Sequence, residues 1–242
     1  MNLCIDIGNT STKLGVFDTE GLKYFCRTDS LSVSTLNHIE GAYPIKQIAV
    51  CASGTVETEL KLYIESKKNC LWLHHNTAMP IQLKYETPNT LGRDRIAAAN
   101  GAFMQYPGKN TAIIATGTCI TMDIVSAKGE FLGGNISPGL EMKLRALHEF
   151  TAGLPRVGVH YSGNLLGKNT FEAIQNGVVR GTIWEMESFI SEAEKNFDDI
   201  IVIICGGNTG FFVNKVKNKI FAHPNLVLEG LNFIIKFGVN DH

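Results

Sequence analysis

Apolar and polar residues are arranged in blocks near the start of the chain, where apolar runs at residues 3–7 and 14–17 flank a turn of Gly, Asn, Thr and Ser. Small and β-branched residues around a glycine turn are typical of a β-hairpin. Residues 113–125 have the same outline: an apolar strand, a Gly-Thr turn and a returning apolar strand. Two such hairpins far apart in one chain predict an internal repeat with two related halves.

The remaining apolar pattern predicts further strands and helices. Short apolar runs predict strands at residues 22–27, 47–51, 70–73 and 200–205. Apolar positions at helical spacing predict helices at residues 32–39, 57–67, 94–106, 138–150, 171–197 and 229–237. Strands precede helices within each half, which favours an α/β architecture of mixed sheets flanked by helices.

Two local signals refine this outline. Ser137 and Pro138 have the residue types preferred at the N-cap and the first position of a helix, so a helix is expected to begin there. Gly177 and Gly181 lie four residues apart inside the longest predicted helix, where glycine is unfavourable unless another backbone approaches closely. They therefore predict a close helix crossing.

A Pro-Gly-Lys-Asn segment precedes the second hairpin and marks the expected domain boundary. It predicts an N-terminal domain at residues 1–108 and a C-terminal domain at residues 109–242, each long enough to bury a core. A hydrophobic content of 44% and a charged content of 19% are typical of a soluble globular protein. The net charge of −1 gives no basis for expecting nucleic acid or an anionic membrane as the main partner.

Apolar runs and cysteines bear on the cellular compartment. The chain has no apolar run of roughly 18 residues and no basic segment followed by a signal core, so we expect a cytoplasmic protein. The six cysteines lie mostly in strand-like apolar runs without Cys-x-x-Cys spacing. We expect them to be reduced and buried, and we expect no zinc site.

The turn of the first hairpin has the residue types of a phosphate site. Gly8 allows close backbone approach, and Thr10, Ser11 and Thr12 add hydroxyl donors. Asp6 adds one carboxylate, and this set suits a phosphate chain with a Mg²⁺ ion that keeps most of its waters. An ordinary hairpin with a polar turn has the same pattern, so the motif alone leaves both interpretations open.

A second chemical centre is expected where a Pro- and Asn-rich segment leads into a helix. Asp94 and Arg95 fall near the helix start, where the positive end of the helix favours an ionised carboxylate. Asp94 is able to accept the proton of an attacking hydroxyl, and Arg95 is able to bind an anionic acceptor or the moving phosphoryl group. A purely structural charge pair at a helix start is the alternative.

A glycine turn follows the apolar strand at residues 200–205. Gly206 and Gly207 lie between this strand and an expected helix start, an arrangement able to cradle the base or sugar of a nucleotide. The chain has neither the GxxxxGK[ST] motif nor the protein-kinase loop set, so P-loop enzymes and protein kinases are excluded.

Six short motifs occur in order along nearly the whole chain: Asp-Ile-Gly-Asn-Thr, Gly-Arg-Asp-Arg, Gly-Thr-Cys-Ile-Thr, Gly-Gly-Asn-Ile-Ser-Pro-Gly, Asn-Thr and Gly-Gly-Asn. With this ordered set the chain resembles the type III pantothenate kinase family. The resemblance implies two ribonuclease-H-like halves of the acetate and sugar kinase/Hsp70/actin superfamily, with the nucleotide site in the cleft between them. It also implies a homodimer that uses ATP to phosphorylate pantothenate to 4′-phosphopantothenate, the first step of coenzyme A biosynthesis.

The same resemblance implies roles for individual residues. It implies binding of the nucleotide phosphates by Asp6, Gly8, Asn9, Thr10, Ser11, Thr12, Lys13 and Thr118. Asp6 is expected to hold Mg²⁺ through water. The resemblance implies binding of pantothenate by Tyr85, Gly92, Arg93, Asp94, Arg95 and Thr170. Asp94 is expected to be the proton acceptor.

One position departs from the family pattern. The second hairpin of the family has Asp-x-Gly-Thr, whose Asp binds a monovalent cation (K⁺ or NH₄⁺), and this chain has Ala115 in that place. Because a methyl group offers no lone pair, we predict weak or absent activation by these cations. Two other hypotheses stay open: a kinase of the same fold for another small alcohol, and a nucleotide-binding regulatory paralogue without turnover. Asp94 and Arg95 argue against the second, whereas Ala115 favours it.

Overall fold

The computed structural model describes residues 1–240, which form two compact units. Unit 1 comprises Met1–Gly108, Val125–Gly133 and the chain from Asn225 onward, and unit 2 comprises Lys109–Ile124 and Gly134–Pro224. The division into domains at residues 108 and 109 stays a prediction. The compact units add that residues 226–240 pack with the N-terminal strands.

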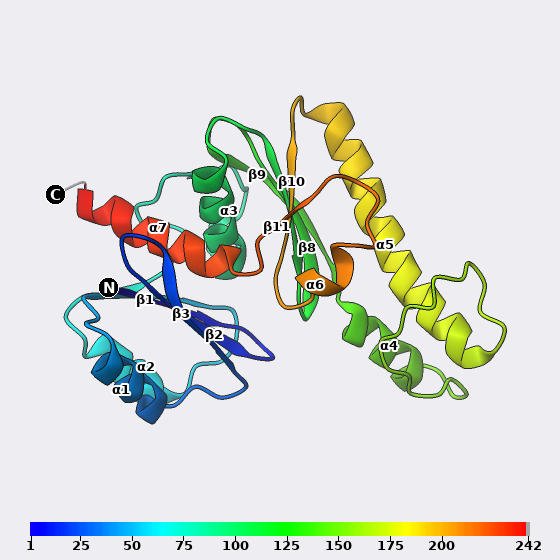
Figure 1. The fold of residues 1–242 in the computed structure, drawn as a ribbon, viewed down its shortest axis with the longest axis horizontal. Coiled ribbons are helices and arrows are strands. Elements are labelled where there is room, and N and C mark those ends of the chain that lie inside the picture. The colour runs from blue at the N-terminus through cyan, green and yellow to red at the C-terminus, as the bar shows by residue number, and fades with distance from the viewer. Residues whose placement is uncertain (241–242) are drawn as a thin grey trace. The chain divides into compact units, whose positions relative to one another are not determined.

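Unit 1 contains a five-stranded sheet of order β3-β2-β1-β4-β5. Figure 1 labels its first three strands, β1, β2 and β3. Its strands are β1 Asn2–Ile7, β2 Thr12–Phe17, β3 Leu22–Thr28, β4 Gln47–Ala52 and β5 Cys70–Trp72. β1 is antiparallel to β2, which confirms the first hairpin, and parallel to β4. Because β1 and β4 are parallel, the hairpin turn that follows β1 and the C-terminal end of β4 lie at the same end of the sheet.

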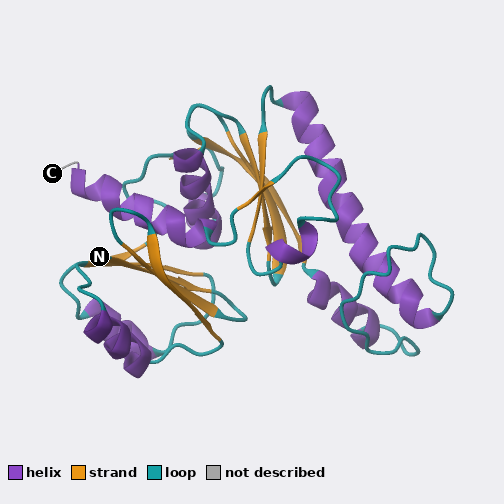
Figure 2. Cartoon of the chain, viewed as in Figure 1, coloured by secondary structure: helices purple, strands orange, loops and turns teal. Residues whose placement is uncertain are grey.

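Helices cover both faces of this sheet (Figure 2). They are α1 Val33–Ala42, α2 Thr58–Glu65, α3 Arg93–Gln105 and α7 Leu226–Asn240, with a short 3₁₀ turn at Pro88–Thr90. On one face, Ile5, Leu14, Leu36 and Ile64 belong to a buried core made by the strands with α1 and α2. On the other face α7 contacts β1 and packs against α3.

The helix crossing of α3 and α7 depends on glycine. A Cβ added to Gly101 would lie 2.6 Å from the carbonyl oxygen of Leu226, and one added to Gly230 would collide with the carbonyl of Ala97. The two backbones can approach this closely only because neither glycine has a side chain. A close glycine crossing therefore exists in unit 1, in a helix pair that the sequence pattern did not single out.

The second sheet has the order β11-β10-β7-β8-β9-β6. Its strands are β6 Gln82–Leu83, β7 Thr111–Thr116, β8 Cys119–Val125, β9 Glu130–Pro138, β10 Ile201–Cys205 and β11 Phe221–Ala222. The run β9-β8-β7-β10-β11 repeats the order β3-β2-β1-β4-β5, and β7 is parallel to β10 as β1 is to β4. The predicted internal repeat is confirmed by this strand order.

The helices of unit 2 are α4 Leu140–Glu149, α5 Thr170–Asn196 and the short α6 Thr209–Phe212. Leu144 of α4 and Val178 and Ile183 of α5 belong to the core of this unit. Asn169 caps α5, because its side chain accepts a hydrogen bond from the backbone N–H of Glu172. The long helix and its starting point are therefore as predicted.

The predicted start of α4 is wrong. Strand β9 continues through Pro138, and the N-cap is Gly139 rather than Ser137. The N–H of Gly139 donates to the carbonyl of Thr118 at 2.9 Å, and a Cβ on Gly139 would collide with the carbonyl of Gly117. Contact with the second hairpin turn thus outweighs the local capping preference of Ser137 and Pro138.

Among residues 1–240, no other backbone crosses α5 closely at Gly177 and Gly181, so the predicted crossing is not made within the single chain. A Cβ added to either residue meets no atom within 4 Å. Both glycines instead line an open groove between α4 and α5.

Among residues 1–240, no helix is both long and apolar enough to span a membrane.

Candidate active site

The first hairpin turn is held close to the loop that follows β4. The N–H of Gly8 donates to the carbonyl of Ser11 at 3.2 Å, and the N–H groups of Ser53 and Gly54 donate to the carbonyl of Ile7 at 2.9 and 3.1 Å. A Cβ on Gly54 would lie 2.5 Å from the carbonyl oxygen of Gly8. Gly54 therefore permits this close contact.

The residues expected to bind phosphate lie on two faces of the hairpin. In the register of β1 and β2, Asp6 is opposite Lys13 and Ile7 is opposite Thr12. Since neighbouring residues on a strand face opposite sides, Asp6 and Lys13 share one face while Thr12 lies on the other. The backbone amides of the turn are common to both faces.

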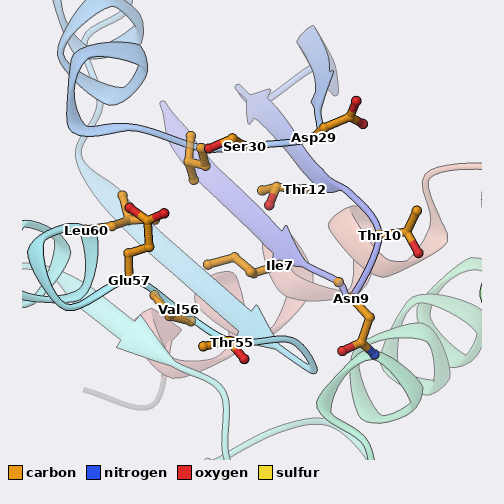
Figure 3. A pocket seen from close by; sticks show the side chains of 12 residues that line it. Ile7, Asn9, Thr10, Thr12, Asp29, Ser30, Thr55, Val56, Glu57 and Leu60 are labelled. Atoms are coloured by element: carbon orange, nitrogen blue, oxygen red, sulfur yellow. The ribbon is translucent and has the colours of Figure 1, made fainter.

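A cavity of about 230 Å³ lies on the Thr12 face. Figure 3 shows its lining, with Ile7 and Thr12 on neighbouring strands and Thr55, Val56 and Glu57 from the segment before α2. Thr12 is only 5% exposed. The structure thus separates Thr12 from the carboxylate of Asp6, although the sequence grouped them in one site.

Asp6 lies among three other titratable groups of unit 1. The thiol Sγ of Cys51 lies 3.4 Å from Oδ1 of Asp6. Burial raises the pKa of Asp6 to about 6, the charge of Lys13 works in the opposite direction, and the carboxylate of Asp94 raises the pKa further. Asp6 and Asp94 are therefore close enough to interact electrostatically.

Asp94 is in the first turn of α3, as predicted. The N-cap residue Gly92 makes no side-chain capping bond, and a Cβ there would lie 2.7 Å from Oδ1 of Asp94. The absence of a side chain at Gly92 leaves room for this carboxylate. Arg93 points back along the chain, where its guanidinium donates to the carbonyls of Asn89 and Leu91 at 3.4 Å each.

Arg95 is enclosed by aromatic rings. It is 5% exposed, and the carbon of its guanidinium lies 5.8 Å from the ring centre of Tyr85 and 5.6 Å from that of Phe131. The two rings meet edge to face, with centres 6.0 Å apart. Phe131, at the start of β9, is a site residue that sequence reasoning missed, because only the pairing of β6 with β9 brings it beside Tyr85.

The structure thus gathers five of the six predicted pantothenate-binding residues in unit 1: Tyr85, Gly92, Arg93, Asp94 and Arg95. The sixth, Thr170, is exposed at the first residue of α5 in unit 2.

The second hairpin turn gathers the predicted nucleotide residues of unit 2. Thr118 is exposed in the turn. A Cβ on Gly206, whose φ is +92°, would lie 2.7 Å from the carbonyl oxygen of Thr116, and the N–H of Asn208 donates to that same carbonyl at 3.0 Å. The turn with Gly206 and Gly207 therefore packs directly beside the second hairpin.

Ala115 is opposite Cys205 in the pairing of β7 with β10. The hydroxyl of Thr116 donates to the carbonyl of Cys205 at 2.9 Å. Asp123 is 1% exposed and lies against Gly134.

Among residues 1–240 no group of three or more His, Cys, Asp or Glu side chains is arranged to hold a metal ion. The single carboxylate Asp6 is compatible with Mg²⁺ that keeps its waters and binds mainly through substrate phosphates.

The fold is that of sugar kinases and ROK family proteins. A ROK family glucokinase from Streptomyces griseus, solved with glucose and AMPPNP, superimposes with a TM-score of 0.52 at 12% identity, covering 95% of this chain and 97% of that one. A Campylobacter jejuni protein described as a candidate Baf family transcriptional activator gives a TM-score of 0.60 at 21% identity, covering 98% and 99%. Similarities at these identities define the fold class.

Sequence comparison then narrows the class to one family. The family model for type III pantothenate kinase matches residues 2–192. A type III pantothenate kinase from Phocaeicola vulgatus is 38% identical over 238 residues, which cover 98% of each chain. The chain belongs to the type III pantothenate kinase family.

Proposed function

We propose that this protein transfers the γ-phosphoryl group of ATP to the hydroxyl group of pantothenate, forming 4′-phosphopantothenate for coenzyme A biosynthesis. The observation that carries the proposal is the position of Asp94 at the start of α3, close enough to Asp6 to raise its pKa. A base for the acceptor hydroxyl thus lies near the carboxylate assigned to the nucleotide's metal. Phosphoryl transfer needs mainly such positioning and charge neutralisation.

Asp94 is the proposed general base. It lies in the first turn of α3, and Gly92 provides the space beside its carboxylate. In the reaction the acceptor hydroxyl gives its proton to the Asp94 carboxylate while its oxygen forms the bond to the γ-phosphorus. The bond from that phosphorus to the bridging oxygen breaks, and ADP leaves.

Arg95, with Tyr85, is the proposed recognition element for pantothenate, whose carboxylate matches the planar guanidinium. The rings of Tyr85 and Phe131 lie within 6 Å of that guanidinium and restrict its orientation. An Arg fixed in this way loses less conformational freedom when it binds an anion. Gly92, Arg93 and Thr170 complete the proposed acceptor set.

The nucleotide is assigned to the turns of both hairpins. The residues are Asp6, Gly8, Asn9, Thr10, Ser11, Thr12 and Lys13 of the first hairpin, and Thr118, Gly206 and Gly207 of unit 2. When bound, Mg²⁺ supplies positive charge against the phosphates, and Asp6 is proposed to contact its waters. Thr12 contributes through its backbone, since its side chain lies on the opposite face from Asp6.

We also propose a homodimer, in the cytoplasm, with a second copy covering the groove between α4 and α5. The groove measures about 880 Å³, and its lining includes Met142, Leu147, Phe150, Gly177 and Gly181. Phe150 is 84% exposed. A contiguous apolar surface of this kind favours a protein interface.

Phe150→Glu is expected to shift the mass measured by analytical ultracentrifugation from dimer to monomer. The control Leu62→Glu, at another exposed apolar residue, is expected to leave the mass unchanged.

A coupled ADP-release assay over pantothenate and a panel of small alcohols and sugars tests the catalytic proposal. We expect turnover with pantothenate and a product heavier by one phosphoryl group in mass spectrometry. Turnover on a sugar but not on pantothenate would identify a kinase for another alcohol. Nucleotide binding without any turnover would identify the regulatory paralogue, the function that Ala115 favours.

A further inference from the structure

Cys51 lies directly beside the carboxylate assigned to the nucleotide's metal. It is on β4, and its partner in the parallel register with β1 is Asp6. Its side chain is fully buried, and Sγ is 3.4 Å from Oδ1 of Asp6, which is within hydrogen-bonding distance for sulfur. Two strands far apart in sequence are needed to make this contact.

The direction of this hydrogen bond is fixed by chemistry. A thiol is protonated at neutral pH unless a positive neighbour stabilises the thiolate. Burial, together with the nearby carboxylates of Asp6 and Asp94, raises the pKa of Cys51 well above its usual value. An ionised carboxylate can only accept, so the S–H of Cys51 donates to Asp6.

We propose that Cys51 is a positioning residue for Asp6: its thiol holds Oδ1 and so orients the carboxylate toward the metal-bearing phosphates of the nucleotide. The proposal rests on the proposed role of Asp6. Rotation about the last bond of an aspartate side chain is loosely restricted, so a fixed donor on one oxygen selects the direction of the other. Without that donor, one lone pair of a partly dry carboxylate loses its partner.

The internal repeat and the neighbouring strand supply two comparison positions. Cys205 takes the place of Cys51 in unit 2, but its register partner is Ala115. Cys4 lies two residues before Asp6 on the same face of β1 and is also fully buried. Cys4→Ala removes a buried thiol of the same size from the same layer and leaves the contact between Cys51 and Asp6 in place, so it is the matched control.

The first test observes the hydrogen bond itself. The S–H stretching band of the native protein in the infrared should contain a component shifted to lower frequency by donation to a carboxylate. We expect Cys51→Ala to remove this component, Asp6→Asn to move it and Cys4→Ala to leave it in place. A spectrum in which Cys51→Ala removes only an unshifted band would overturn the proposal. This measurement needs no turnover, so it stands even if pantothenate is not the acceptor.

The second test measures binding of ATP by calorimetry, without acceptor, in Mg²⁺ and in EDTA. Because a thiol is a weak donor but its acceptor is charged, we expect Cys51→Ala to weaken binding of MgATP about tenfold. Binding in EDTA should change little, and Cys51→Ser, which keeps a donor, should recover most of the loss. Three outcomes would each show that Cys51 has only a packing role. They are equal losses of affinity with and without Mg²⁺, an equal loss in Cys4→Ala, and no recovery in Cys51→Ser.

Discussion

The two hairpins of this protein share a backbone frame but differ in chemistry. Each consists of two antiparallel strands joined by a glycine turn. A parallel strand lies beside the first strand of each hairpin, with a buried cysteine at or near its end. In the first, the residue facing that cysteine is Asp6, whose pKa is raised to about 6. In the second it is Ala115. At this one position the first hairpin therefore has a carboxylate and the second has a methyl group.

The neighbouring hydroxyl does not restore the missing charge. Thr116 is 1% exposed, and its hydroxyl already donates to the carbonyl of Cys205. That hydrogen bond joins β7 to β10, so Thr116 stabilises the sheet at the point where a cation ligand would be needed. The repeated fold thus gives both units the same backbone position. The side chain at that position determines whether a charged group is present there.

The largest expected effect concerns Asp94, which lies near the charged hairpin. Asp94→Asn should lower kcat about 10²-fold or more, because the amide cannot accept the proton of the acceptor hydroxyl. ATP binding and the circular dichroism spectrum should be unchanged. Steady-state kinetics with saturating pantothenate measure this directly, and a wild-type rate would show that Asp94 is only a helix-terminal charge.

The next effect separates the two substrates. Asp6→Ala should raise the KM for MgATP about tenfold or more while the KM for pantothenate changes little, since the carboxylate is assigned to the hydration shell of the metal. Titration of each substrate against the other at saturation gives both values. Equal increases for the two substrates, or a loss of folding, would remove the distinction between Asp6 and the acceptor site.

A smaller effect is expected at Ala115 of the second hairpin. Initial rates of the native protein should depend weakly or not at all on K⁺ or NH₄⁺ at constant ionic strength, because Ala115 offers no charged ligand. Ala115→Asp should introduce a dependence on K⁺, and Ala115→Ser serves as a polar, uncharged control. A steep K⁺ dependence in the native protein that Ala115→Asp leaves unchanged would contradict the comparison of the two hairpins.

The smallest effect is on stability and depends on pH. The pKa of Asp6 rises from 3.8 to about 6 in the folded state, so the folded state holds this proton after the unfolded chain has lost it. The stability that the protonated group contributes is therefore present below about pH 4 and lost as the pH rises through about 6. One pKa unit corresponds to about 1.4 kcal/mol, and the partial exposure of Asp6 reduces the effect of the full shift. Without nucleotide or Mg²⁺, we therefore expect the free energy of unfolding of Asp6→Asn to exceed that of the native protein above pH 6 by roughly 1 kcal/mol.

Denaturant titrations of Asp6→Asn and native protein between pH 4 and pH 8 provide the measurement. The difference in unfolding free energy between Asp6→Asn and the native protein should shrink toward pH 4. Asp18 is a surface carboxylate of the same unit with a lowered pKa, so the control Asp18→Asn should show the opposite dependence on pH. A difference that is independent of pH would mean that the ionised Asp6 is not destabilising.

Much of the fold is determined by short-range patterns. The apolar runs around the glycine turns gave both hairpins, and the polar start of α3 placed Asp94 in its first turn. The helical periodicity of residues 171–197 predicted α5. These features depend on residues within a few positions of one another, so one sequence is enough to predict them.

Tertiary structure decided what depends on distant segments. Gly139 replaced Ser137 as a helix cap because it must approach the second hairpin turn, and Gly101 and Gly230 rather than Gly177 and Gly181 form the close helix crossing. The register of β1 with β4 brought Cys51 to Asp6, and β6 brought Phe131 to Tyr85 and hence to Arg95. Local propensities cannot specify such contacts, because register and helix crossing are set by packing between segments that lie far apart in the chain.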